Sequence, residues 1–123
     1  MEKVLVIDDS ELIRAYVRVG LKKLGVDITA MDNASVALLA LKDGQALPSL
    51  IFVDINMPGL NGYAFTRSLK NDLRFKLIPV IFITANDSQW DKDHAKGCGA
   101  ADYITKPFTV PAIMEIIRRY IPA

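Results

Sequence analysis

The sequence has few of the residues that build disulfides or metal clusters. It contains one cysteine, Cys98, and one histidine among its 123 residues. A single cysteine forms no internal disulfide, and a structural zinc site normally needs four Cys or His ligands, so we expect neither. One free thiol is most simply interpreted as the mark of a reduced, cytoplasmic setting.

Long apolar runs and a strong excess of one charge are also missing. No apolar run approaches the roughly 20 residues that a bilayer-spanning helix needs. The first run, residues 4–7, is too short for the core of a signal peptide. The formal net charge is +1, with no basic stripe or acidic tail. We therefore expect neither a membrane nor a nucleic acid as a direct partner.

The sequence does contain a regular alternation of two kinds of segment. Its length suits one domain, residues 1–123. Short runs rich in Val and Ile are typical of buried parallel strands, and the longer segments between them repeat apolar residues at helical spacing. The predicted strands are residues 4–7, 26–30, 50–53, 80–84 and 102–104.

Helix signals occupy the intervals between these strands. The first helix ends at Gly25, a residue typical of helix C-termini. The second covers residues 34–41, and Pro111 fits the first turn of the last. The fourth, residues 88–98, has a sparse apolar face, so we expect it to be loosely anchored. Ser10 is the expected N-cap of the first helix, and Asp32 or Asn33 that of the second. The third helix begins near Asn61, and the last follows Thr109.

Repeated strand–helix alternation favours an α/β fold with a parallel sheet covered on both faces. We expect a flavodoxin-like, doubly wound (βα)5 domain with strand order 2-1-3-4-5. Ligands bind beyond the carboxyl ends of the strands in such sheets. Polar residues at those ends are therefore the candidates for a functional site.

Such residues follow four of the predicted strands. In chain order they are Asp8 and Asp9, Asp54, Thr84, and Lys106 with Pro107. Each alone has an ordinary interpretation, since Asp caps helices and Lys is usually solvated. Three converging carboxylates, however, would resist ionisation without a counter-ion. Lys106 supplies one positive charge, and Mg²⁺, which binds carboxylate and phosphate oxygens, would supply the rest. A carboxylate in that setting can act as a nucleophile toward phosphorus.

These residues, in this order, resemble the receiver domain of bacterial two-component response regulators, especially the CheY-like single-domain type. The resemblance extends over essentially the whole chain. It rests on residues 6–10 (VIDDS), 53–59 (VDINMPG), 83–85 (ITA) and 103–108 (YITKPF).

The resemblance implies that Asp54 accepts a phosphoryl group from a phosphohistidine on a histidine kinase or histidine phosphotransfer protein. Asp9, Asp54 and the backbone carbonyl of Asn56 would bind Mg²⁺, with Asp8 acting mainly through water. Lys106 would pair with the phosphate, and a cis peptide bond would precede Pro107. Such a protein is a signalling switch, and it catalyses only its own phosphorylation and dephosphorylation. Chemotaxis is one behaviour that this family controls.

The resemblance also implies how the switch works. The Thr84 hydroxyl would move toward the phosphate, and the Tyr103 ring would rotate into the space it leaves. Ala85 is small enough for a close approach to the phosphate, and Asn86 borders the path of the attacking water. The fourth helix, fifth strand and fifth helix would then bind a downstream target protein. Trp90 on that helix is either a core residue or a partner-facing anchor.

Three other interpretations remain open at this point. The first is the receiver part of a longer regulator with a DNA-binding or enzymatic output domain. A hydrolase acting on external phosphomonoesters would commonly carry a second Asp two positions after the nucleophile, where this sequence has Asn56. A flavin-binding module is conceivable from the fold alone, although an acidic pocket would repel the cofactor phosphate.

Overall fold

The strands form one parallel sheet. The computed structural model describes residues 2–44, 46–85, 93 and 96–121. In that part of the chain the strands are β1 (Lys3–Ile7), β2 (Asp27–Met31), β3 (Leu50–Asp54), β4 (Val80–Thr84) and β5 (Asp102–Thr105). They lie in the order β2-β1-β3-β4-β5, and every pairing is parallel. The predicted α/β fold and strand order are confirmed.

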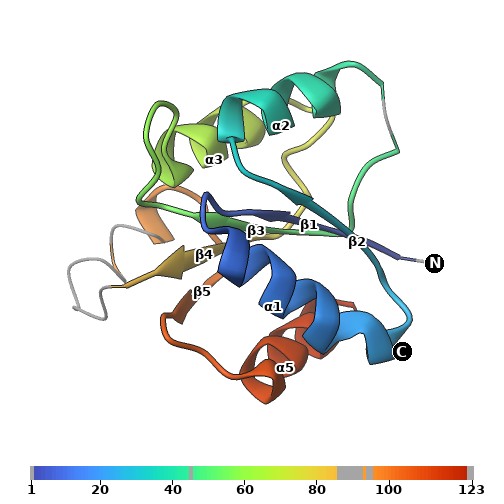
Figure 1. The fold of residues 1–123 in the computed structure, drawn as a ribbon. Helices are drawn as coiled ribbons and strands as arrows, with labels where there is room; N and C mark the ends of the chain where they lie inside the picture. The colour runs from blue at the N-terminus through green and yellow to red at the C-terminus, as the bar shows by residue number, and fades with distance from the viewer. Residues whose placement is uncertain (1, 45, 86–92, 94–95, 122–123) are drawn as a thin grey trace.

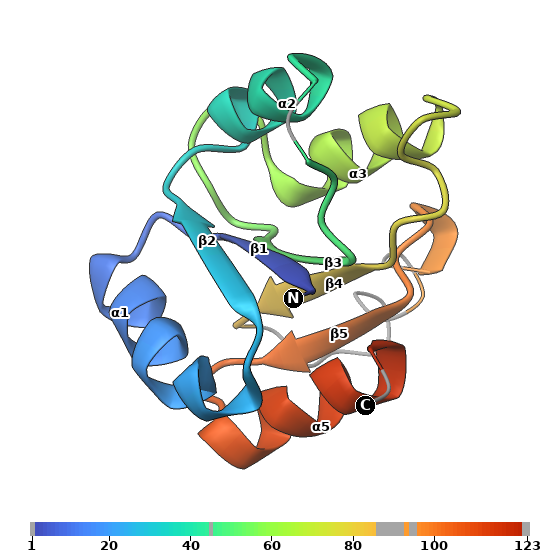
Figure 2. The same cartoon turned by 90° about the vertical axis from the view of Figure 1, so that its right-hand side faces the viewer.

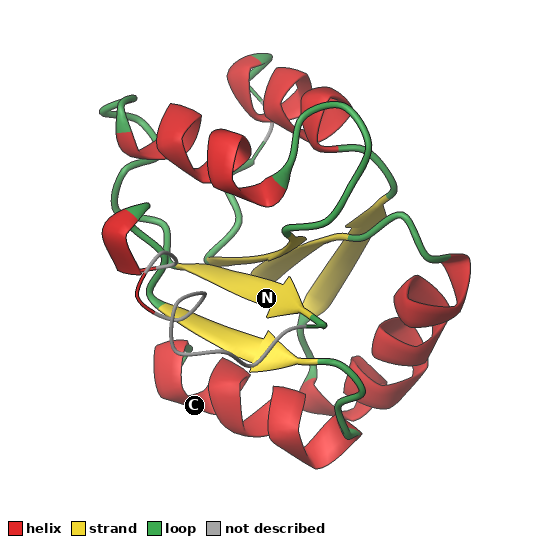
Figure 3. Cartoon of the chain, turned by 90° about the vertical axis from the view of Figure 1, so that its left-hand side faces the viewer, coloured by secondary structure: helices red, strands yellow, loops and turns green. Residues whose placement is uncertain are grey.

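Helices cover both faces of the sheet. They are α1 (Glu11–Leu21), followed by a 3-10 turn (Lys22–Leu24), α2 (Ala34–Lys42), α3 (Gly62–Lys70) and α5 (Val110–Tyr120). Figures 1 and 3 show α1 and α5 on one face and α2 and α3 on the other. The helix predicted over residues 88–98, with Trp90, lies mostly outside the described residues. No helix that the structure describes is long and apolar enough to cross a bilayer.

A polar side chain caps the start of each of these four helices. The predicted cap Ser10 is confirmed for α1, and Asn33 rather than Asp32 caps α2. Each cap side chain accepts a hydrogen bond from a backbone N–H of the first turn, an interaction worth about 1 kcal/mol. The accepting residues are Ser10, Asn33, Asn61 and Thr109. Gly25 closes the first helical segment in the left-handed conformation, with φ of 70°.

Alternating residues of the strands belong to two separate apolar clusters, one on each face of the sheet. In β1, Leu5 and Ile7 pack with α2 and α3, whereas Val4 and Val6 pack with α1 and α5. Every residue of β3 and β4 is buried, as expected where helices cover both faces. The central strands are thus fixed from both sides, and their carboxyl ends are held in one place.

Strand limits differ slightly from the prediction, because pairing extends them. β2 lies one residue later than expected, since Met31 pairs with the last residue of β1. β3 includes Asp54, which pairs with Ile83 of β4, and β5 extends to Thr105.

The start of α3 packs against the backbone that carries Asp54. A Cβ added at Gly62 would lie 2.8 Å from the Ile55 Cα and 2.9 Å from the Asp54 carbonyl oxygen. Gly62→Ala should therefore lower the free energy of unfolding by about 1–3 kcal/mol, as overpacking does, measured by urea denaturation. Gly97→Ala, where an added Cβ meets no atom within 4 Å, is the matched control. Equal stability of the two variants would contradict this packing.

Candidate functional site

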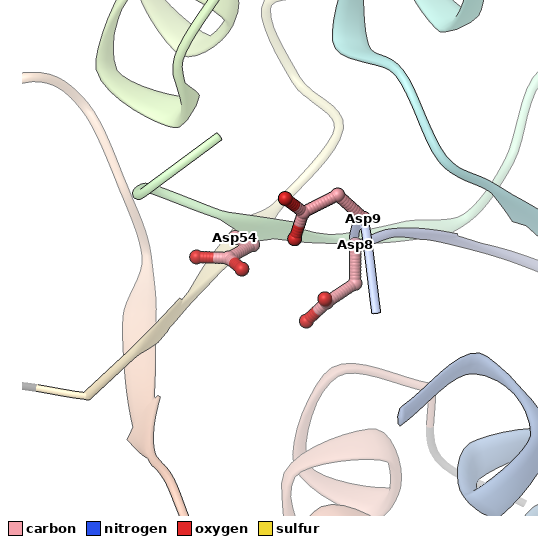
Figure 4. A group of neighbouring side chains, drawn as sticks. All are labelled: Asp8, Asp9 and Asp54. Carbon is pink, nitrogen blue, oxygen red and sulfur yellow. The ribbon is translucent and has the colours of Figure 1, made fainter. Parts of the chain in front are cut away.

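Three aspartates converge at the carboxyl ends of β1 and β3 (Figure 4). Asp8, Asp9 and Asp54 each offer one carboxylate oxygen, and these oxygens lie within 4.8 Å of one another. Asp8 and Asp54 are 0% and 4% exposed, whereas Asp9 is open to solvent. The strand order brings these residues together, as the sequence predicted.

Lys106 places its ammonium group between the two buried carboxylates. Its Nζ donates a hydrogen bond to Asp54 Oδ2 at 3.1 Å and lies 3.1 Å from Asp8 Oδ2. The backbone N–H of Lys106 donates to the Thr84 carbonyl at 2.7 Å, which fixes the start of the β5–α5 loop. The peptide bond between Lys106 and Pro107 is cis, as expected.

Backbone N–H groups orient both buried carboxylates. The Ser10 N–H donates to Asp8 Oδ1, and the Asn56 N–H donates to Asp54 Oδ1, each at 2.9 Å. In each case Oδ1 faces the loop that follows its strand. The Oδ2 atoms are thereby left for Lys106 and for any further cation.

Arg14 is a part of the site that the sequence analysis did not select. Its guanidinium donates to the backbone carbonyl of Asp8 at 2.8 Å, from the end of the first turn of α1. This bond ties α1 to the loop that carries Asp8 and Asp9. An arginine at this spacing is a weak signal in a sequence, because helix surfaces carry many arginines.

Negative charge exceeds positive charge among these side chains, since three carboxylates face one ammonium. Burial, reinforced by the charge of Asp54, raises the pKa of Asp8, although the Ser10 and Lys106 contacts act in the opposite direction. Burial alone would lower the pKa of Lys106, but its contacts with Asp8 and Asp54 outweigh burial and raise that pKa. Lys106 therefore stays charged, and it does not fully compensate the carboxylates.

One buried oxygen has an ion-pair partner but no hydrogen-bond donor. Asp8 Oδ2 accepts no hydrogen bond from the residues that the structure describes, because its contact with Lys106 is an ion pair without hydrogen-bond geometry. A buried, unsatisfied carboxylate oxygen is costly. The oxygen-rich cluster fits Mg²⁺, which prefers oxygen ligands and commonly uses one or two carboxylates.

Four other predicted site residues lie at the ends of β4 and β5 or in β5. Thr84 is buried and ends β4, one position beyond Ile83, the partner of Asp54. Tyr103 is half-buried and packs against the cluster that includes α2 and α3 residues. Ala85 and Pro107 are exposed. Asn86 lies outside the described residues.

Residues 4–118 match the family described as "Response regulator receiver domain". The chain belongs to this family. Receiver domains are signalling switches that interact with histidine kinases or phosphotransfer proteins and with downstream targets. In this receiver the acidic pocket of Asp8, Asp9 and Asp54 fits the phosphorylation site.

Similar proteins support the same assignment for this receiver. Protein PilG of Pseudomonas aeruginosa is 41% identical over 98% of this chain and 88% of its own length. The chemotaxis response regulator CheY4 of Vibrio cholerae has a solved structure with a TM-score of 0.90, at 28% identity over 98% of this chain and 99% of that one. The receiver domain of the P. aeruginosa sensor histidine kinase PA1611 has a TM-score of 0.87, at 25% identity over 99% of this chain and 98% of that one. That structure is described with a magnesium ion coordinated in its active-site cleft.

Metal binding by this receiver is testable through stability. A ligand at ten times its Kd that binds only the folded state adds about 1.4 kcal/mol to the free energy of unfolding. We expect Mg²⁺ to raise Tm in calorimetry, and we expect Asp9→Asn to remove most of that rise. Glu11→Gln, an equal charge change at an exposed position in the first turn of α1, should keep it. A Mg²⁺ effect that survives Asp9→Asn would mean that the ion binds elsewhere.

Proposed function

We propose that this receiver is switched by phosphorylation of Asp54 in a two-component or phosphorelay pathway. The observation that carries the proposal is the position of the Lys106 ammonium, 3.1 Å from Asp54 Oδ2 and from Asp8 Oδ2. A carboxylate flanked by an ammonium and a pair of acids suits nucleophilic attack on phosphorus with charge neutralisation. The donor is a phosphohistidine of a histidine kinase or phosphotransfer protein.

In the transfer step, an Asp54 carboxylate oxygen forms a bond to phosphorus. The phosphorus–nitrogen bond to the donor imidazole breaks, and its electron pair leaves with the nitrogen. Lys106 then pairs with a phosphate oxygen, so the negative charge on that oxygen is compensated by the ammonium. Asp9, Asp54 and the backbone carbonyl of Asn56 would hold Mg²⁺, with Asp8 bound through water. When bound, the ion neutralises negative charge on the phosphate oxygens.

Return to the resting state uses water. Water attacks the phosphorus, the acyl phosphate bond breaks, and Asp54 leaves as a carboxylate. The family resemblance implies that Asn56 and Asn86 influence how long the phosphate lasts. The protein thus catalyses only its own phosphorylation and dephosphorylation.

The signal is carried by the residues that end β4 and line β5. The Thr84 hydroxyl donates a hydrogen bond to a phosphate oxygen, beside the small Ala85 and near Pro107. Tyr103 then rotates into the space that Thr84 leaves. The phosphate favours this conformer only by the free energy of its new contacts, so the change is a population shift.

The output surface comprises the helix predicted over residues 88–98, β5 and α5. Two contacts connect the last two of these elements. Arg119 forms an ion pair with Asp102 at 2.6 Å, and the Tyr120 hydroxyl donates to the Ala101 carbonyl at 3.1 Å. A target protein binds this surface in the cytoplasm. If the receiver belongs to a longer regulator, an attached output domain takes the place of that target.

Phosphoryl uptake is the direct test of the proposal. After incubation with acetyl phosphate and Mg²⁺, intact-protein mass spectrometry should show a gain of one phosphoryl group. Asp54→Asn should abolish the gain, because an amide oxygen is a far weaker nucleophile than a carboxylate. Asp32→Asn, an equal change at an exposed turn, should leave it intact.

Two results would count against the assignment. A gain that persists in Asp54→Asn would place the phosphate on another residue. A wild-type protein that binds Mg²⁺ but takes phosphate neither from acetyl phosphate nor from any phosphorylated histidine donor would be a receiver that switches without phosphorylation.

A further inference from the structure

Two leucines stand almost fully in water on the loop between α3 and β4, residues 71–79. Leu73 is 86% exposed and Leu77 is 89% exposed, the highest values among the large hydrophobic side chains that the structure describes. Burial of a leucine side chain is strongly favourable. Because both lie on one short loop, the two side chains are candidates for contact with a common surface.

This loop is firmly built. Phe75, between the two leucines, is 1% exposed and anchors the loop in the core. The backbone N–H groups of Phe75 and Lys76 both donate to the Asp72 carbonyl, at 3.0 and 2.9 Å. The Lys70 ammonium donates to the carbonyls of Lys76 and Ile78, at 3.1 and 2.7 Å. These hydrogen bonds and the buried Phe75 fix the backbone of the loop, with both leucine side chains in solvent.

The loop also carries positive charge. Residues 70–77 include three basic side chains, Lys70, Arg74 and Lys76, and one acid, Asp72. Arg74 forms an ion pair with Asp72 at 2.8 Å, and this pairing lowers the pKa of Asp72 to about 2. Arg74 and Asp72 thus offset each other, and Lys70 and Lys76 leave residues 70–77 with a net charge of +2. The complementary partner is both apolar and anionic.

The small apolar area favours a lipid surface over a folded protein. Two leucine side chains supply well under the ~800 Å² per partner that a stable protein interface buries. A bilayer needs no such area, because apolar tips enter between headgroups while neighbouring Lys and Arg side chains attract anionic lipids. The sequence led us to expect no membrane partner because no apolar run is long enough to span a bilayer, but surface docking needs no such run.

The loop lies at the opposite end of the sheet from the acidic site. It leads into Val80, the first residue of β4, whereas Asp54 is the last residue of β3. Figure 2 shows it following α3, at the edge where β4 begins. A surface bound there leaves the carboxyl ends of the strands open to a phosphodonor.

We propose that the α3–β4 loop is a weak docking site for anionic lipid surfaces. Leu73 and Leu77 insert between the headgroups, and Lys76 lies against the lipid phosphates. This places the receiver at the inner surface of a membrane without any spanning segment. The site is independent of Asp54 and of phosphorylation chemistry.

Flotation of the full chain with vesicles tests this proposal. Vesicles of equal parts phosphatidylglycerol and phosphatidylcholine should carry the wild-type protein upward, and vesicles of phosphatidylcholine alone should carry much less. The double variant Leu73→Ser/Leu77→Ser should lower the bound fraction at least about tenfold, with Tm and the Mg²⁺ response unchanged.

The matched control is Leu12→Ser/Val19→Ser on α1, where the side chains are 82% and 76% exposed. This variant should float like the wild type. No flotation of the wild type, equal loss in both double variants, or equal binding to neutral and anionic vesicles would each overturn the proposal. If the wild type does not float, the two leucines are more simply explained as a contact for another protein.

Discussion

The ammonium of Lys106, 3.1 Å from one carboxylate oxygen of Asp54 and 3.1 Å from one of Asp8, is the interaction on which the site depends. Without it, two buried carboxylates would face each other across the ends of β1 and β3. Like charges this close repel each other, and the Lys106 ammonium offsets part of that repulsion. Net negative charge remains, so the site attracts a further cation.

The sheet makes this arrangement possible by fixing distances between residues far apart in the chain. Asp54 pairs with Ile83, and Thr84 pairs with Thr105, the residue before Lys106. Two apolar clusters clamp the same strands from opposite faces. Close packing at Gly62 brings α3 against the Asp54 backbone. The polar site is therefore positioned mainly by the packing of the apolar core, and less by the ion pairs and hydrogen bonds among its own side chains.

The two ends of the sheet differ in chemistry. At the carboxyl ends, three acids and a lysine form a polar pocket that excludes apolar side chains. At the amino end of β4, a braced loop presents Leu73 and Leu77 beside basic residues. Separation of a phosphorylation site from a docking surface lets one occur without blocking the other. Any coupling between them would have to pass through β4 and the packed core.

By itself, the sequence determined the kind and order of the elements. Short Val- and Ile-rich runs, the caps Ser10, Asn61 and Thr109, and Gly25 at a helix end are local signals, and local physics is enough to interpret them. The polar residues at the strand ends could also be named, because parallel strands of known order bring their carboxyl ends together.

Only the tertiary structure decided how deeply each of those residues is buried and which groups it contacts. Asp8 is buried while its neighbour Asp9 is exposed, and Arg14 reaches back to the Asp8 carbonyl. On the far edge, Phe75 is buried and the leucines on either side of it are not. These outcomes depend on neighbours that are distant in sequence. Burial, and with it the pKa of a carboxyl or the exposure of a leucine, is a property of the packed whole.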